Sequence, residues 1–96
     1  MSGDNIKEKL QKYFELTSKA LKKVKIPANL DIKSKKSAED FLDLSQRYFD
    51  DAKYFEKKGD LVNAYGAVVY AHVFLDAGAR LRFFDVGKDN DLFMID

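Results

Sequence analysis

The side chains best suited to acid–base chemistry lie four residues apart, toward the end of the most apolar segment of the chain. His72, Asp76 and Arg80 follow one another at the spacing that places side chains on one side of a helix. A histidine oriented by a carboxylate can move a proton near neutral pH. No nucleophile, second base or phosphate-binding loop accompanies these residues. We therefore interpret them first as a polar ladder that orders a helix face, and second as candidate contacts for a ligand or partner.

Metal and thiol chemistry have little support in the sequence. The chain has no cysteine, so disulfides and thiolate ligands are not available. Metal sites in helical bundles combine inward-facing glutamates with Glu-x-x-His spacings, and no such spacing occurs. Asp43, Arg47 and Asp51 alternate in charge at four-residue spacing, which is typical of a solvated helix face. We predict no metal site, no cofactor and no catalytic residue, and an enzymatic role is the less favoured alternative.

Three helices are expected to carry these side chains. The apolar periodicity predicts them at about residues 5–25, 37–58 and 60–86. Pro27 should end the first helix, and Ser37 should cap the second. Gly59 should end the second helix and turn the third antiparallel to it, while Gly87 should end the third. The predicted fold class is therefore all-α, an antiparallel up-down-up three-helix bundle.

This bundle should occupy residues 1–87, with a short C-terminal tail over residues 88–96. The third helix is apolar on nearly every face, and two adjacent stripes suit a helix wedged between two others. Tyr70 and Leu81 belong to the second of these stripes, together with Ala67, Phe74 and Ala77. A further face is too apolar for contact with water alone, and we expect the tail or a partner chain to cover it. It contains Val62, Gly66, Val69 and Val73, together with Asp76 and Arg80.

The tail and one tyrosine complete the candidate contact residues. Leu92 and Phe93 belong to an apolar run that we expect to dock on the chain's own bundle, with contact to a partner as the alternative. Tyr54 lies off the apolar stripe that the second helix should turn toward the other helices, so it is a candidate for surface contact. The full set of candidate ligand or partner contacts is Val62, Val69, Val73, His72, Asp76, Arg80, Tyr54, Leu92 and Phe93.

Composition is typical of one globular domain, with 96 residues of which 46% are hydrophobic and 34% charged. No long apolar run is free of charge, so we predict no membrane span, and the polar N-terminus does not resemble a secretory signal. A cytoplasmic location is the expectation. Residues 1–36 carry ten lysines and four acids, whereas residues 37–96 carry seven basic residues and twelve acids. Such a bipolar chain can associate head to tail or bind a charged partner.

The basic segment over residues 19–36 contains neither arginine nor aromatic residues, which are usual where proteins recognise nucleic acid specifically. The sequence therefore argues against nucleic acid as the partner and leaves nonspecific phosphate contact as an alternative.

The span from Tyr48 to Phe84, above all DAKYFEKKGDLVNAYGAVVYAHVFLDAGARL, resembles an archaeal family catalogued as domain of unknown function 357. The most recognisable part is the Asp-Ala-Gly-x-Arg-Leu segment from Asp76 to Leu81. The resemblance implies a short cytosolic protein with a three-helix bundle, and it transfers no catalytic residues. A weaker similarity to one tetratricopeptide unit supports a helical hairpin only, because the chain has no second copy.

These observations favour a noncatalytic helical bundle that acts by protein–protein association. The partner is expected to be a second copy of the chain or another, unidentified protein. Two alternatives remain open at this level. One is a small enzyme or ligand-binding domain that uses His72, Asp76 and Arg80. The other is a nonspecific nucleic-acid accessory protein.

Overall fold

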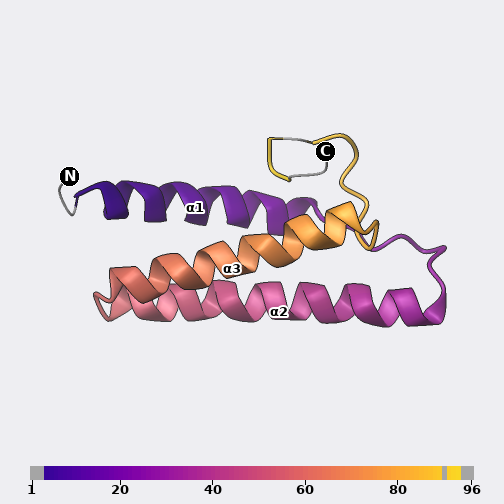
Figure 1. The fold of residues 1–96 in the computed structure, drawn as a ribbon, viewed down its shortest axis with the longest axis horizontal. Coiled ribbons are helices and arrows are strands. Elements are labelled where there is room, and N and C mark those ends of the chain that lie inside the picture. Colours follow the sequence, from indigo (N-terminus) through magenta and orange to yellow (C-terminus); the bar gives the residue numbers. More distant parts are fainter. Residues whose placement is uncertain (1–3, 90, 94–96) are drawn as a thin grey trace.

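The computed structural model describes residues 4–89 and 91–93 and contains three helices (Figure 1). They are α1 (Asp4–Lys23), α2 (Ile32–Lys57) and α3 (Leu61–Arg80). α1 and α3 run in one direction and α2 runs in the other, which confirms the predicted all-α, up-down-up three-helix bundle. Positions 90 and 94–96 of the predicted tail lie outside the described residues.

α3 lies between the other two helices, as its apolar stripes predict (Figure 1). Its buried alanines allow close approach, and they pack with Leu10 of α1 and Phe49 of α2 in one apolar cluster. Removal of this surface from water is the main stabilising contribution to such a core. A helix with two neighbours nevertheless keeps a side that neither covers. Tyr70 and Leu81, expected in the second stripe, are accordingly 59% and 58% exposed.

α2 begins at Ile32, five residues before the predicted start at Ser37. Asp31 caps this end, because its Oδ1 accepts the backbone N–H of Ser34 at 2.7 Å and its Oδ2 accepts the Ser34 hydroxyl at 3.3 Å. Both bonds lower the pKa of the Asp31 carboxyl. The bond from the Ser34 N–H has the larger effect and the bond from the Ser34 hydroxyl the smaller one. The periodicity missed this first turn because Ile32 is 78% exposed and does not continue the buried pattern.

α3 ends at Arg80, whereas the periodicity predicted a helix to residue 86. The N–H of Phe83 bonds to the Gly78 carbonyl at 2.8 Å, and the N–H of Arg82 bonds to the Ala79 carbonyl at 3.1 Å. These two bonds are the Schellman motif that closes many helices. The apolar residues after Arg80 form a turn that packs back on the bundle, and a one-dimensional pattern does not distinguish such a turn from more helix.

A second apolar cluster joins the C-terminal segment, meaning the described residues after Arg80, to the bundle. Phe84, Val86 and Phe93 are 3%, 5% and 2% exposed, and they pack with Ala20 of α1 and Leu75 of α3. The described part of the tail therefore docks on the chain's own bundle, as expected. The expectation that it covers the valine-rich side of α3 is wrong for the described residues, because Val62 and Val73 stay exposed.

Candidate functional site

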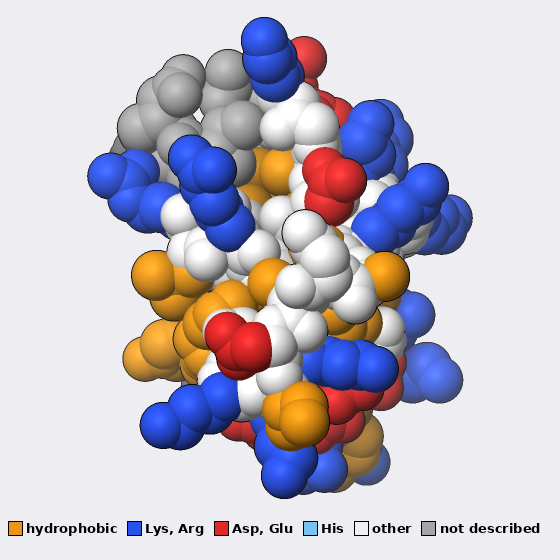
Figure 2. All heavy atoms as spheres, turned by 90° about the vertical axis from the view of Figure 1, so that its right-hand side faces the viewer, with side chains coloured by type: hydrophobic (Ala, Val, Ile, Leu, Met, Phe, Trp, Pro, Cys, Tyr) orange, Lys and Arg blue, Asp and Glu red, His pale blue; other side chains and the backbone are white. Residues whose placement is uncertain are grey.

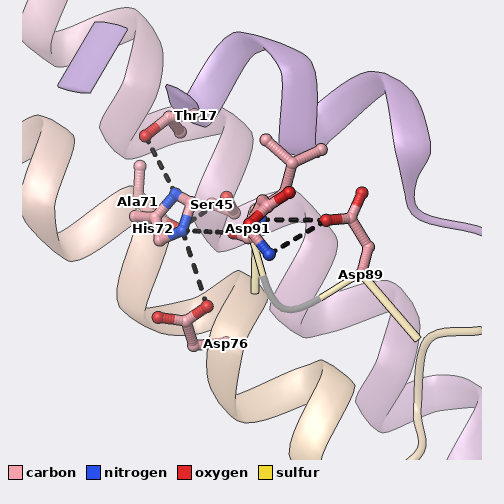
Figure 3. A network of polar contacts seen from close by, with 8 residues as sticks. Thr17, Ser45, Ala71, His72, Asp76, Asp89 and Asp91 are labelled. Carbon is pink, nitrogen blue, oxygen red and sulfur yellow. Dashed lines mark hydrogen bonds and ion pairs between the residues drawn. The ribbon is translucent and has the colours of Figure 1, made fainter. Parts of the chain in front are cut away.

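His72, the one histidine of the chain, is buried on α3 where α1 and the C-terminal segment meet (Figure 3). Its Nδ1 lies 3.1 Å from the Thr17 hydroxyl on α1. Its Nε2 lies 2.8 Å from the backbone carbonyl of Leu92 and 3.5 Å from Oδ1 of Asp76. The imidazole ring therefore connects two helices with the C-terminal segment.

The acceptors around His72 determine where its proton lies. The Leu92 carbonyl and the Asp76 carboxylate can only accept, so Nε2 carries a hydrogen and donates it. In the neutral ring Nδ1 then accepts the hydroxyl hydrogen of Thr17. Both ring nitrogens are thus engaged by groups of the protein itself.

The Leu92 carbonyl is directed at His72 by a turn of the C-terminal segment. Asp89 and Asp91 of this turn are labelled in Figure 3. Asp89 Oδ1 accepts the N–H groups of Asp91 and Leu92, each at 3.1 Å. An aspartate that bonds to the backbone two and three residues ahead fixes a local turn. Lys23 of α1 lies 3.9 Å from the other carboxylate oxygen of Asp89, so a weak ion pair holds the turn near α1.

Access to His72 is restricted by the rings around it. Its residue is 7% exposed, the edge of Tyr13 lies 6.4 Å away between centroids, and the face of Phe93 lies 6.5 Å away. A general acid or base must reach a substrate proton within hydrogen-bond distance. The surroundings of His72 are those of a structural clamp that joins α3 to α1 and to the C-terminal segment.

Thr17 and Ser45 are polar residues of the buried region whose roles the sequence did not reveal. Neither was among the candidate contact residues, and both are fully buried. Thr17 bonds to His72, and the Ser45 hydroxyl donates to the Ala71 carbonyl at 2.8 Å across the α2–α3 contact. The sequence feature that could have indicated them is a hydroxyl residue within an otherwise apolar helical stripe. Their hydrogen-bond partners lie too far away along the chain for a spacing rule to identify.

The remaining predicted contact residues are dispersed. No ion pair within the described residues involves Arg80, which is exposed and lies beside the hollow at the end of α3. Tyr54 of α2 is 58% exposed, with Lys58 Nζ 5.5 Å from its ring centroid. Leu92 and Phe93 face the chain's own bundle, and Phe93 is a core residue. The structure therefore brings His72, Asp76, Leu92 and Phe93 together, and leaves Arg80 and Tyr54 apart from them.

The most exposed apolar part of the bundle is the valine face of α3, formed by Val62, Gly66, Val69 and Val73. Val62 is 73% exposed and Val73 is 50% exposed, while Val69 is half-buried. Tyr70 borders this face, and its ring centroid lies 5.4 Å from that of Tyr48 of α2, with the two ring planes tilted by 32°. An apolar strip of this length along one helix is a feature of interaction surfaces.

Metal sites and membrane spans are two further features to consider among the described residues. No group of three or more histidine or acidic side chains within them could hold a metal ion. None of the helices in the described ranges is long and apolar enough to cross a bilayer.

A comparison with protein-family models matches residues 12–84 to a family described as Protein of unknown function (DUF357). The match covers well over half of the 96 residues. The chain belongs to the DUF357 family. No curated protein and no solved structure matches it.

Within this DUF357 chain, the matched residues contain Thr17, His72 and the whole valine face. The match ends at Phe84, before Leu92, whose carbonyl completes the contacts of His72. The family description assigns no activity. A function for this DUF357 chain must therefore be argued from its own geometry.

Proposed function

We propose that this DUF357 chain is a noncatalytic helical bundle that associates with a second copy of itself through the valine face of α3. The observation that carries the proposal is the exposure of Val62 and Val73 on a helix whose other sides are largely covered. Removal of exposed apolar side chains from water would favour such an association.

Gly66, in the middle of the valine face, supports the proposal. A glycine inside a helix costs about 1 kcal/mol relative to alanine. At Gly78 the Phe84 ring occupies the space of the missing side chain, so the fold itself requires glycine there. At Gly66 no atom outside the local helix backbone lies within 4 Å of the position of a Cβ. A helix of a second molecule that approaches α3 closely would supply the missing reason for a glycine.

The spacing of the valine face suits a two-fold axis. Its four residues are separated by four, three and four positions, so the pattern reads the same in both directions. When two copies of α3 run antiparallel, Val62 lies opposite Val73 of the partner subunit and Gly66 lies opposite Val69 of the partner subunit. Each Val69 can then fill the space beside a glycine. Both copies would use the same patch, as in isologous dimers.

The dimer is expected to be weak. From Val62 to Val73 the face spans about 16 Å of helix. A contact between single helices of this length falls below the roughly 1,200 Å² that stable interfaces bury. We therefore expect association that depends on protein concentration and no permanent dimer.

Sedimentation velocity over a concentration series tests the proposal. The parent chain should shift from the mass of one chain toward that of two as concentration rises. Val73→Asp should weaken the dimer at least about tenfold, because it introduces a charge into an apolar contact. Gly66→Ala should raise the melting temperature of the dilute monomer, because alanine is the better helix former. The same substitution should weaken the dimer, because its methyl group occupies the space of closest approach.

The matched control is Ile32→Ser, which removes an exposed apolar side chain from the start of α2, outside the valine face. It should leave the association unchanged. A parent chain that keeps the mass of one chain at every concentration would overturn the proposal. Equal weakening of the association by Ile32→Ser and Val73→Asp would also overturn it, because the association would then be nonspecific and hydrophobic.

The alternative of a small enzyme or ligand-binding domain is the less supported one. Both nitrogens of His72 have partners inside the protein, and Arg80 is directed to another part of the surface. A contact role for Tyr54, the archaeal source implied by the resemblance and the cytoplasmic location stay predictions.

A further inference from the structure

A hollow of about 530 Å³ lies where the α1–α2 connection meets the end of α3. Pro27 and Asn29 line it from the connection, and Arg80 and Arg82 line it from α3 and the turn that follows. The basic segment identified in the sequence has no arginine of its own. The fold therefore supplies two guanidinium groups to this segment from a distant part of the chain.

The charge around the hollow is mainly positive. Neither Arg80 nor Arg82 takes part in an ion pair within the described residues, and both are exposed. Asp85 is the one acidic residue of the lining, and its Oδ1 already accepts the N–H of Gly87 at 3.2 Å. This end of the molecule faces the viewer in Figure 2, where basic side chains are distributed around it.

Three lysines extend the positive surface beyond the hollow. Lys22, Lys23 and Lys25 line a second, smaller hollow of about 280 Å³, and Lys23 is the one of the three that pairs weakly with Asp89. The two hollows share the turn over residues 85–87, so they lie on either side of it. Several cations around a concave surface raise the local concentration of anions.

Arg82 has a backbone conformation that its side chain disfavours. Its φ is 63°, and it is the one non-glycine residue with positive φ among the described residues. The end of α2 forms the same Schellman motif, with bonds from Gly59 to Glu56 and from Asp60 to Phe55. There the left-handed position is held by Gly59, at φ 77°.

The left-handed position of the motif is therefore held by glycine after α2 and by arginine after α3. Glycine adopts the left-handed region without steric cost, whereas a residue with a Cβ is strained in it. Strain at a position where glycine would relieve it indicates that the side chain has a role of its own. At Arg82 that side chain is a guanidinium beside the hollow.

We propose that Arg80 and Arg82 bind a phosphate group of a phosphorylated ligand in this hollow. Guanidinium groups donate paired hydrogen bonds to phosphate oxygens, and two of them can hold one dianion from two sides. The hollow is larger than a phosphate ion, so it has room for part of the group that carries the phosphate. The hollow lies at the end of α3, beyond Val73, and the proposal does not rest on self-association.

Two probes test the site and distinguish the source of the phosphate. Inorganic pyrophosphate, followed by titration calorimetry, represents small phosphorylated ligands. A fluorescent single-stranded oligonucleotide, followed by anisotropy, represents backbone phosphates. Binding of pyrophosphate supports a small ligand. Binding of the oligonucleotide alone, with an affinity that falls steeply with salt, supports a nucleic acid.

The informative variant is Arg82→Gly. If Arg82 had only a structural role, this substitution would lower the melting temperature. It should weaken binding at least about tenfold. It should also raise the melting temperature by several degrees, because it relieves the strained backbone. Loss of binding in a more stable protein excludes damage to the fold as its cause. Arg80→Gln should weaken binding as well.

The control is Arg47→Gln on α2, whose guanidinium pairs with Asp43 at 2.9 Å. This variant has the same loss of charge and should bind like the parent. If the parent chain binds neither probe, the proposal is overturned. Parent-like affinity in Arg82→Gly, or an equal loss in Arg47→Gln, would overturn it too.

Discussion

At the scale of single residues, three buried polar side chains fix how the helices meet. Thr17, Ser45 and His72 are buried, and each has a hydrogen-bond partner on another element. No buried side-chain nitrogen or oxygen among the described residues lacks a partner. A buried polar group without a partner costs about 1–3 kcal/mol. A helix that slid along its neighbour would incur this cost, so the three residues define the register of the bundle.

The Thr17–His72 contact gives a prediction about stability. Thr17→Val keeps the size of the side chain but removes the partner of His72 Nδ1. We expect the free energy of unfolding to fall by about 1–3 kcal/mol, because the buried nitrogen then has no partner. Urea unfolding followed by circular dichroism measures this change.

Thr17→Ser is the matched control for this prediction, since it keeps the hydroxyl and removes only a methyl group. It should lose about 1 kcal/mol, mainly from burial. Equal stability of Thr17→Val and the parent would show that the contact does not stabilise the fold.

At the scale of the element, α3 contains two glycines with different surroundings. Gly78 lies under the Phe84 ring, which is buried and follows a backbone held by bonds to the Gly78 carbonyl. Gly66 faces open space. The same substitution should therefore have opposite effects on the folding of one helix.

Gly78→Ala is predicted to destabilise the protein although alanine is the better helix former. Its methyl group would overlap the Phe84 ring, and overpacking of this kind costs about 1–3 kcal/mol. A lower melting temperature in a calorimetric scan is the expected result. Phe84→Leu in the same chain should restore part of the loss, since it shortens the side chain. A higher melting temperature for Gly78→Ala alone would contradict the packing described for this turn.

At the scale of the whole molecule, the C-terminal segment joins the ends of the helices. Phe93 packs in the second apolar cluster, and Leu92 accepts a hydrogen bond from His72. The described residues of the segment contact α1 and α3 and leave Val62 and Val73 exposed. Its contribution to folding should therefore be separable from association.

Phe93→Ala and a truncation after Gly87 test this separation. Loss of the buried ring should cost about 3–5 kcal/mol, with a fall in melting temperature of more than about 10 °C. Dimerisation measured at a temperature where the variants are folded should match that of the parent. An unchanged melting temperature together with lost association would instead identify the segment as the contact offered to a partner.

The sequence by itself determined the number, order and direction of the helices. Apolar periodicity acts over three to four residues, and Pro27 and Gly59 act on their immediate neighbours. Helix formation depends on the same short range, so these signals were sufficient. Helix ends were less well predicted. The start of α2 depends on a cap preceding an exposed turn, and the end of α3 depends on the Phe84 ring returning to Gly78.

The tertiary structure alone decided which side chains meet. His72 bonds to groups 55 and 20 residues away along the chain. Arg80 and Arg82 join Pro27 and Asn29 in one hollow because the helices end together. Val62 and Val73 stay exposed, while Leu92 and Phe93 pack in the second apolar cluster. Contacts of this kind depend on helix packing and on the path of the connections, and a pattern of near neighbours in sequence contains neither.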